Sequence, residues 1–201
     1  ETYFVRELDL NAKIAYVERR ETDYYTQAVL ESNVLIKNSR EGTPPVDSPA
    51  GDFVATHSYA ANYGEVDVSW QTVAFKKIKF NTRENIGLGP VDLPPQQLST
   101  TAAWVTPDDG VRAAMKAAGW RASEGLVGLR NVAVVALPLI AMCDSRDLGG
   151  VVDSKNLGRP TLILYDRYPG GLGYCEKGYR NVRQLLEMCR EMVAECPCDQ
   201  G

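Results

Sequence analysis

The chain has 201 residues, of which 44% are hydrophobic and 24% charged, and its net charge at pH 7 is −4. This length and composition are typical of one large or two small globular domains that bury a core of their own. The acidic balance excludes a general polyanion-binding surface, so any contact with nucleic acid must come from a local basic patch.

The first third of the sequence predicts β-structure. Residues 3–10 and 14–17 are short strand-like runs around a turn, which suits a hairpin, and a third strand pattern runs from Tyr24 to about Lys37. We interpret Tyr24 and Tyr25 as half-buried strand residues rather than as a base-stacking platform. The chain opens on a strand-like segment without the basic and apolar series of a signal peptide, so we expect a cytoplasmic piece of a longer protein.

A change of composition follows at residues 39–63, which are rich in Ser, Gly, Pro, Asp and Ala and have no hydrophobic period. A loop of this length in a compact domain is usually an insertion or a mobile segment. Residues 64–80 then form the longest β pattern of the chain, in which Val66 and Val68 alternate with polar residues. This alternation predicts a strand with one face on a core.

Four basic residues gather at the end of this pattern: Lys76, Lys77, Lys79 and Arg83. The two-residue period of a strand puts Lys77 and Lys79 on one face, with aromatic residues interleaved along the strand. A basic strand with aromatic neighbours can bind a phosphate backbone, and DNA is the polymer we expect. Lysines that keep an edge strand soluble and unpaired are the alternative, and both interpretations stay open.

The predicted elements divide into two halves and indicate an α+β fold. A connector rich in Gly and Pro separates a β-rich subdomain, residues 1–95, from an α/β subdomain, residues 96–201, that leads into a truncated cysteine cluster. The first half is predicted to be an antiparallel sheet or small barrel, and the second a mixed α/β half with a buried central helix. Residues 98–105 are a further strand candidate, and Thr106 is predicted to cap the helix that follows.

The central helix is predicted over residues 124–137, capped by Ser123 and ending before Pro138. It is apolar nearly all round, so we expect it to be buried. The longest apolar run, Val132–Cys143, is shorter than the roughly 18 to 20 residues that span a bilayer. We therefore expect a soluble protein without a membrane segment.

Two carboxylates follow this helix in the run Cys143-Asp144-Ser145-Arg146-Asp147. Asp144 and Asp147, three residues apart, can hold a metal ion or act as an acid–base pair. The alternative is that they cap a turn and pair with Arg146. The residues alone do not choose between these roles.

Residues 161–166 predict a buried strand that ends on Asp166 and leads through a Pro-Gly-Gly-x-Gly turn into a helix. A strand, a glycine loop and a helix N-terminus form a phosphate cradle when backbone N–H groups face one concavity. Gly170, Gly171 and Gly173 can instead let the strand and the helix pack closely. Their spacing matches neither of the common nucleotide-binding motifs.

The last predicted helix spans residues 178–195 and carries an apolar stripe that includes Cys189. We interpret Cys189 and Cys175 as core residues. Cys196 and Cys198 differ, because two thiols one residue apart after a helix can form half of a tetrathiolate zinc site. An odd number of cysteines, five, without secretory marks indicates reduced thiols.

Catalytic machinery is not apparent in the sequence. The single histidine, His57, lies in a polar loop with no catalytic partner, and no nucleophile stands beside a base. We therefore expect no catalytic residue and no small-molecule ligand in this chain.

Eight motifs occur in the order ETYFVRELDL, DYYT, GEV, FKKIKFNTRENIG, LSTTAAW, CDSRDLGG, ILYDRYPGGLGY and CPC. Together they resemble the C-terminal domain of bacterial superfamily-two DNA helicases of the mitomycin-repair type. The resemblance covers nearly the whole chain except the insertion at residues 39–63. In that family the domain follows two motor domains, and a second cysteine pair completes one zinc site.

The resemblance implies a non-catalytic accessory domain of an ATP-dependent DNA helicase, which docks on the motor domains and assists DNA binding in repair. It implies that Cys196 and Cys198 are zinc ligands, completed by a cysteine pair that is not in this sequence. The ATP-binding motifs are also outside it, so motor activity is expected of the parent chain or a partner subunit. Two alternatives stay open: an accessory domain of an anti-phage defence protein, and a small nucleotide- or phosphate-binding enzyme that uses the Pro-Gly-Gly-x-Gly turn.

Overall fold

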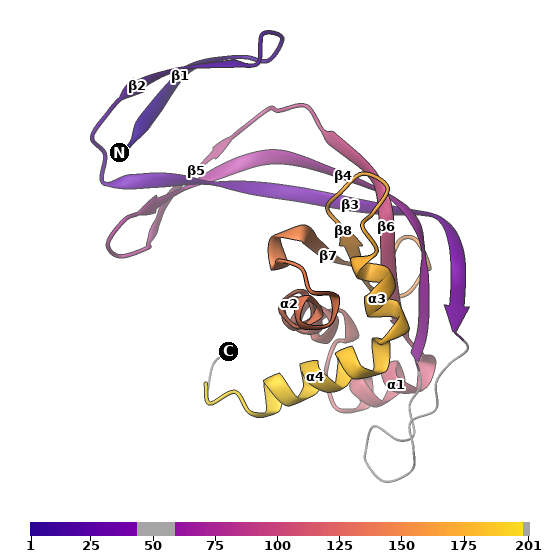
Figure 1. Ribbon diagram of the computed structural model, residues 1–201. Helices are drawn as coiled ribbons and strands as arrows, with labels where there is room; N and C mark the ends of the chain where they lie inside the picture. The colour runs from indigo at the N-terminus through magenta and orange to yellow at the C-terminus, as the bar shows by residue number, and fades with distance from the viewer. Residues whose placement is uncertain (44–58, 199–201) are drawn as a thin grey trace. The chain divides into compact units, whose positions relative to one another are not determined.

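The computed structural model describes residues 1–43 and 59–198 and confirms the predicted α+β fold (Figure 1). The strands are β1 (Tyr3–Asp9), β2 (Ile14–Arg19), β3 (Tyr24–Thr43), β4 (Tyr59–Lys79), β5 (Asn85–Pro90), β6 (Gln96–Pro107), β7 (Leu148–Asp153) and β8 (Thr161–Asp166). The helices are α1 (Asp109–Ala117), α2 (Ala122–Ala141), α3 (Tyr174–Arg180) and α4 (Val182–Ala194), and a 3-10 turn, η2, spans Ser145–Asp147.

Two compact units share the chain. One comprises residues 1–31 and 70–96, and the other comprises residues 32–69 and 97–201. Strands β3 and β4 run from one unit into the other, so the units are interleaved in sequence. The subdomain boundary near residue 95 stays a prediction, and the structure adds that residues 32–69 fold together with the second half of the chain.

The first unit is built from antiparallel hairpins. β1 pairs with β2 as the sequence predicts, and β5 pairs with the end of β4. The second pairing contains an irregularity between Lys77 and Ile78. The backbone N–H of Phe80 donates to the carbonyl oxygen of Asp23 at 3.1 Å, which joins the end of β4 to the residue before β3.

Strands β3, β4, β6, β8 and β7 lie side by side in that order, with β8 antiparallel to both of its neighbours. Asn156, in the loop after β7, forms hydrogen bonds with β3 and so links the first and last strands of this sheet. The N–H of Ile36 donates to Asn156 Oδ1 at 2.9 Å, and Asn156 Nδ2 donates to the carbonyl oxygen of Val34 at 2.7 Å. The side-chain amide thus replaces the donor and acceptor of a neighbouring strand along the edge of β3.

The core of the second unit forms where α2 packs on β7, β8, α3 and α4 (Figure 1). The buried residues of α2 are Leu126, Ala133, Ala136, Leu137 and Ala141. The prediction of a helix buried all round is wrong for its other face, where Val135 is 56% and Leu139 65% exposed. Cys175 and Cys189 are buried in this core, which confirms their interpretation as packing residues.

Among the described residues, α2 is the one helix long and apolar enough to cross a membrane, judged by length and composition alone. A single such helix is weak evidence for a membrane span, because the core helix of a globular protein has the same composition. The packing of one face of α2 against two strands and two helices accounts for its apolar sequence.

Helix starts differ from the sequence-based predictions. Asp108 caps α1 by accepting a hydrogen bond from the Val111 N–H at 2.8 Å. Thr106, the predicted cap, is buried instead, and its hydroxyl lies 3.1 Å from that of Thr161 on the adjacent strand. Asp108 and not Thr106 is the cap because β6 continues through Thr106 and the chain turns only at Asp108.

The ends of the later helices also differ. α2 starts with Arg121 at its cap, not Ser123, and runs through Pro138 to Ala141. Only one turn follows the proline, so few hydrogen bonds are at risk there. The predicted final helix is broken at Asn181, whose side chain donates to the carbonyl oxygen of Lys177 at 2.8 Å, so α3 and α4 are separate.

The predicted insertion is shorter than expected. β3 continues to Thr43 and β4 begins at Tyr59, so both ends of the predicted loop 39–63 are strand. The rest of the loop, including His57, lies outside the described residues. Within β4, Val66 and Val68 are buried as their alternation predicts.

Candidate functional site

Asp166 ends β8 and is fully buried. Its Oδ2 accepts hydrogen bonds from the backbone N–H groups of Leu172, Gly173 and Tyr174 at 2.7, 2.9 and 3.2 Å, and its Oδ1 accepts one from Cys175 at 2.9 Å. These are the N–H groups of the glycine turn and the start of α3, which the sequence offers as a phosphate cradle. In the structure the protein's own carboxylate fills that cradle.

The glycines of the turn supply its backbone shape. Gly170, Gly171 and Gly173 all have positive φ, at 75°, 76° and 84°, a region that residues with a Cβ rarely adopt. Gly171 also packs tightly, since a Cβ there would lie 2.0 Å from Thr101 Oγ1 on β6. This geometry is that of close packing around a buried carboxylate.

A second set of hydrogen bonds ties the same turn to β6. The Thr100 hydroxyl donates to the carbonyl oxygens of Asp166 and Tyr168 at 2.9 and 2.8 Å. The N–H of Gly170 donates to the carbonyl oxygen of Ser99 at 2.9 Å. The turn is therefore held from both sides, and Asp166 lies at its centre.

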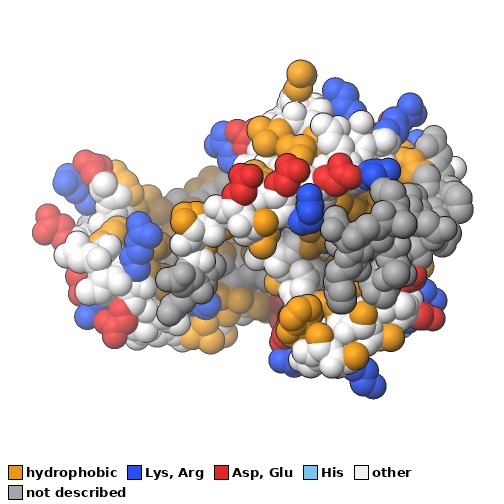
Figure 2. Space-filling model, turned by 90° about the horizontal axis from the view of Figure 1, so that it is seen from below, with side chains coloured by type: hydrophobic (Ala, Val, Ile, Leu, Met, Phe, Trp, Pro, Cys, Tyr) orange, Lys and Arg blue, Asp and Glu red, His pale blue; other side chains and the backbone are white. Residues whose placement is uncertain are grey.

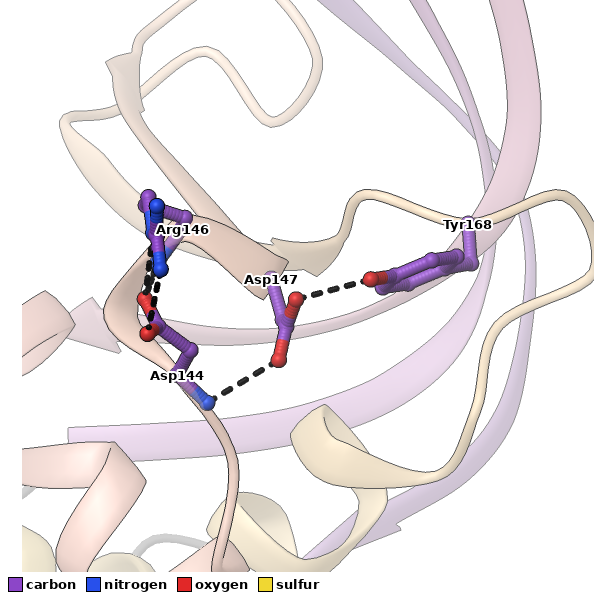
Figure 3. Close-up of polar contacts among 4 residues, drawn as sticks. All are labelled: Asp144, Arg146, Asp147 and Tyr168. Atoms are coloured by element: carbon purple, nitrogen blue, oxygen red, sulfur yellow. Dashed lines mark hydrogen bonds and ion pairs between the residues drawn. The ribbon is translucent and has the colours of Figure 1, made fainter.

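Asp144 and Asp147 form a capping box around η2 (Figure 3). Asp144 accepts from the N–H of Arg146 at 2.8 Å and pairs with its guanidinium at 3.1 Å, while Asp147 accepts from the N–H of Asp144 at 2.9 Å. The hydroxyl of Tyr168 donates to Asp147 at 2.8 Å. Hydrogen bonds from the Arg146 side chain and backbone lower the pKa of Asp144 to about 2, so it stays ionised at neutral pH.

These contacts match the role of a structural turn. No group of three or more His, Cys, Asp or Glu residues that could hold a metal ion occurs in residues 1–43 and 59–198. An apolar cavity of about 20 Å³ lies in the core of the second unit, between Leu137, Leu162 and Leu185. It is too small for a substrate, since about this volume holds a single water.

On the face of the molecule in Figure 2, the coloured Lys and Arg side chains are dispersed and interspersed with Asp and Glu. That face shows no continuous basic field. The net charge of −4 likewise favours a local arrangement, such as the end of β4, for any contact with DNA.

The structure separates the predicted basic cluster over two faces of β4. Lys77 and Lys79 lie on one face, because side chains alternate along a strand. The Lys77 ammonium lies 5.3 Å from the centre of the Tyr24 ring, and Lys79 Nζ lies 3.9 Å from the Glu84 carboxylate. These contacts orient both side chains. Both lysines are half-buried, so each is still accessible to solvent.

Lys76 and an aromatic pair occupy the other face of this strand end. The rings of Tyr25 and Phe80 lie 5.5 Å apart between centres and are inclined by 40°. The predicted half-burial is correct for Tyr24 and wrong for Tyr25, which is exposed. The pair was missed because it joins two strands whose register the sequence does not show. Arg83 is exposed in the turn after β4.

Cys196 and Cys198 follow α4 and are exposed. A hydrogen bond to the Cys198 side chain, and a second to its backbone, lower the pKa of the Cys196 thiol. Two neighbouring thiols suit half of a tetrahedral zinc site, and the described residues do not supply the other half.

The chain is similar to one region of helicases of the MrfA type. Residues 129–201 match the MrfA Zn-binding domain, and the predicted resemblance to the C-terminal domain of mitomycin-repair-type helicases is confirmed. This match supports zinc as the metal bound in this family.

Individual relatives match over nearly the whole chain. The uncharacterized ATP-dependent helicase YprA of Bacillus subtilis (strain 168) is 34% identical over 209 residues, which cover 99% of this chain and 25% of YprA. The DUF1998 helicase MrfA, in its crystal structure bound to DNA, is 31% identical, with a TM-score of 0.64. The alignment covers 99% of this chain and 25% of the MrfA chain. MrfA bound to DNA and AMPPNP is 32% identical with a TM-score of 0.57, covering 99% and 23%. The chain thus spans about a quarter of the length of these relatives.

Proposed function

We propose that this chain is a non-catalytic accessory domain of an ATP-dependent DNA helicase, which docks on the motor domains and assists DNA binding in repair. The observation that carries the proposal is the match of 99% of the chain to a quarter of MrfA, a helicase crystallised bound to DNA. The exposed apolar face of α2 is of the kind that protein partners cover, which supports docking.

The geometry favours an accessory role over an enzymatic one. Asp166 occupies the N–H groups that a nucleotide phosphate would need. Asp144 and Asp147 are engaged in the η2 turn, with Arg146 and Tyr168 as their partners. The sequence-based alternative of a phosphate-binding enzyme therefore lacks a vacant cradle among the described residues.

The DNA contact is expected to include Lys76, Lys77, Lys79 or Arg83. Reversing the charge of Lys77 and Lys79 to Glu in the full-length helicase is expected to weaken DNA binding. The magnitude of the slope of log affinity against log salt falls by about one unit for each lost phosphate contact, without a change in sequence preference. Equilibrium binding over a salt titration measures both quantities.

A matched control for this experiment reverses Lys116 and Lys155, which lie on α1 and after β7 and change the net charge equally. It is expected to leave affinity nearly unchanged. Unchanged affinity in the Lys77 and Lys79 variant across the titration excludes this patch. A loss of ATP-coupled unwinding with unchanged affinity assigns these lysines to docking on the motor domains.

Zinc binding is expected to require the second cysteine pair that the resemblance implies. A structural zinc site is normally closed by four protein ligands, and Cys196 and Cys198 supply two. Residues 1–201 alone should purify without stoichiometric zinc, and the full-length protein with about one equivalent that Cys196→Ser removes. Elemental analysis of the purified proteins measures this, with Cys143→Ser as the control that keeps its zinc. Stoichiometric metal in residues 1–201, lost on substituting Cys143 or Cys175, contradicts the prediction.

A further inference from the structure

Two exposed aromatic rings lie at the strand end that carries the basic residues. Tyr25 is 39% exposed and Phe80 is 48% exposed, and their ring centres lie 5.5 Å apart. An inclination of 40° between the rings leaves them side by side at an angle rather than stacked face to face. Both rings are therefore accessible to a flat partner.

Backbone hydrogen bonds hold these rings in place. The Phe80 N–H donates to Asp23 at 3.1 Å, the Lys79 N–H donates to Glu84 at 3.0 Å, and the Arg83 N–H donates back to Lys79 at 3.1 Å. The last two bonds define a tight turn between β4 and β5, which carries Phe80 and Arg83, and the first joins that turn to the residue before β3, which carries Tyr25. The backbone around both rings is therefore fixed, and little ordering is needed when a ligand binds.

Two exposed cations, Lys76 and Arg83, belong to the same strand end as the aromatic pair. Lys76 lies on the same face of β4 as the pair, because the Lys77–Tyr24 contact belongs to the opposite face. Lys76 is exposed, and among the described residues neither it nor Arg83 has an assigned ion-pair or hydrogen-bond partner for its side chain. Aromatic rings flanked by exposed cations suit a ligand that alternates flat bases with phosphates.

The exposed rings indicate that the ligand is single-stranded rather than duplex DNA. In a duplex, each base is stacked between its neighbours and offers no face to a protein side chain. In a single strand, every base has an accessible π-face, and stacking on aromatic side chains tolerates any sequence.

We propose that Tyr25 and Phe80 stack on unpaired bases of single-stranded DNA, while Lys76 and Arg83 contact its phosphates. This inference rests on the proposed function, which requires a DNA contact at this strand end without specifying the form of the DNA. The site places single-stranded product or substrate of the helicase against the first unit of this domain.

The test combines a protein variant with a change in the DNA. In the full-length helicase, Tyr25→Leu with Phe80→Leu removes both rings and keeps apolar volume. The probes are a single-stranded oligothymidine, an abasic strand of equal length and a duplex. The variant is expected to bind oligothymidine about 5-fold or more weakly, since base–aromatic stacking is worth at least that factor per base. Its affinity for the abasic strand and the duplex is expected to equal that of the wild type.

Three controls accompany the variant. Tyr16→Leu removes a ring of similar exposure, 51%, on β2 and is expected to have no effect. Tyr25→Phe with Phe80→Tyr keeps both rings and is expected to keep oligothymidine affinity, which separates loss of stacking from loss of folding. The salt slope of the leucine variant should match that of the wild type, because no phosphate contact is removed.

The possible failures are distinguishable. Equal losses on oligothymidine and abasic DNA, or no loss on either, overturn base stacking. The proposed function survives that result if reversal of Lys77 and Lys79 still weakens binding. Reduced unwinding with unchanged affinity for all three probes overturns the inference in favour of a protein-facing role for the rings.

Discussion

Replacement of Asp166 by Ala is expected to lower the free energy of unfolding by about 3–5 kcal/mol. The substitution removes a carboxylate that accepts hydrogen bonds from four backbone N–H groups. The N–O distances of these bonds in the native protein are 2.7 to 3.2 Å. The residue is fully buried, so water cannot simply take its place. For a chain of this size the loss corresponds to a drop in Tm of about 6–20 °C.

Thermal unfolding followed by circular dichroism measures this effect. Asp144→Asn is the matched control, because Asn can still accept from the Arg146 N–H and loses only an ion pair with an exposed arginine, so it should change Tm little. If Asp166→Ala unfolds at the temperature of the wild type, the hydrogen bonds of the glycine turn do not stabilise the fold. The interpretation of that turn as a structural element would then be wrong.

Replacement of Asn156 by Asp is expected to destabilise the second unit by about 2–4 kcal/mol. The Nδ2 group of Asn156 donates to the carbonyl oxygen of Val34 at 2.7 Å and to Asp153 Oδ2 at 2.8 Å. An oxygen in its place faces two acceptors, one of them a carboxylate, and repels both. The edge of β3 also loses its hydrogen bond from Asn156 to Val34, while Oδ1 can still accept from the Ile36 N–H.

Urea unfolding at pH 7 measures this loss, with Asn131→Asp on the exposed surface of α2 as the control. The wild type should also depend on pH through the same contact. Although burial opposes it, hydrogen bonds from Asn156 lower the pKa of Asp153. The resulting stabilisation is present above the ordinary pKa of Asp and is lost as pH falls through the lowered value. A midpoint for Asn156→Asp equal to that of the wild type would show that the bridge carries no stability.

Local patterns in the sequence predicted most of the strands and the local parts of the candidate site. The alternation of Val66 and Val68 predicted a strand with one face buried, and the structure has both residues in the core. The two thiols of Cys196 and Cys198 and the basic run at the end of β4 are likewise visible in sequence, because their members are neighbours along the chain. Helix ends were less predictable, since Asp108 and Arg121 take the cap positions only in the context of the strands around them.

The sequence by itself determined the fold class, the family relation and the chemical types available at each site, because hydrophobic period and motif order are properties of short stretches of chain. Only the tertiary structure decided what the polar and aromatic groups contact. The glycine turn is occupied by Asp166, Asn156 bonds to a strand 122 positions away, and Tyr25 meets Phe80 across two strands. Such partners depend on strand register and on packing, which bring together residues that are distant in the sequence.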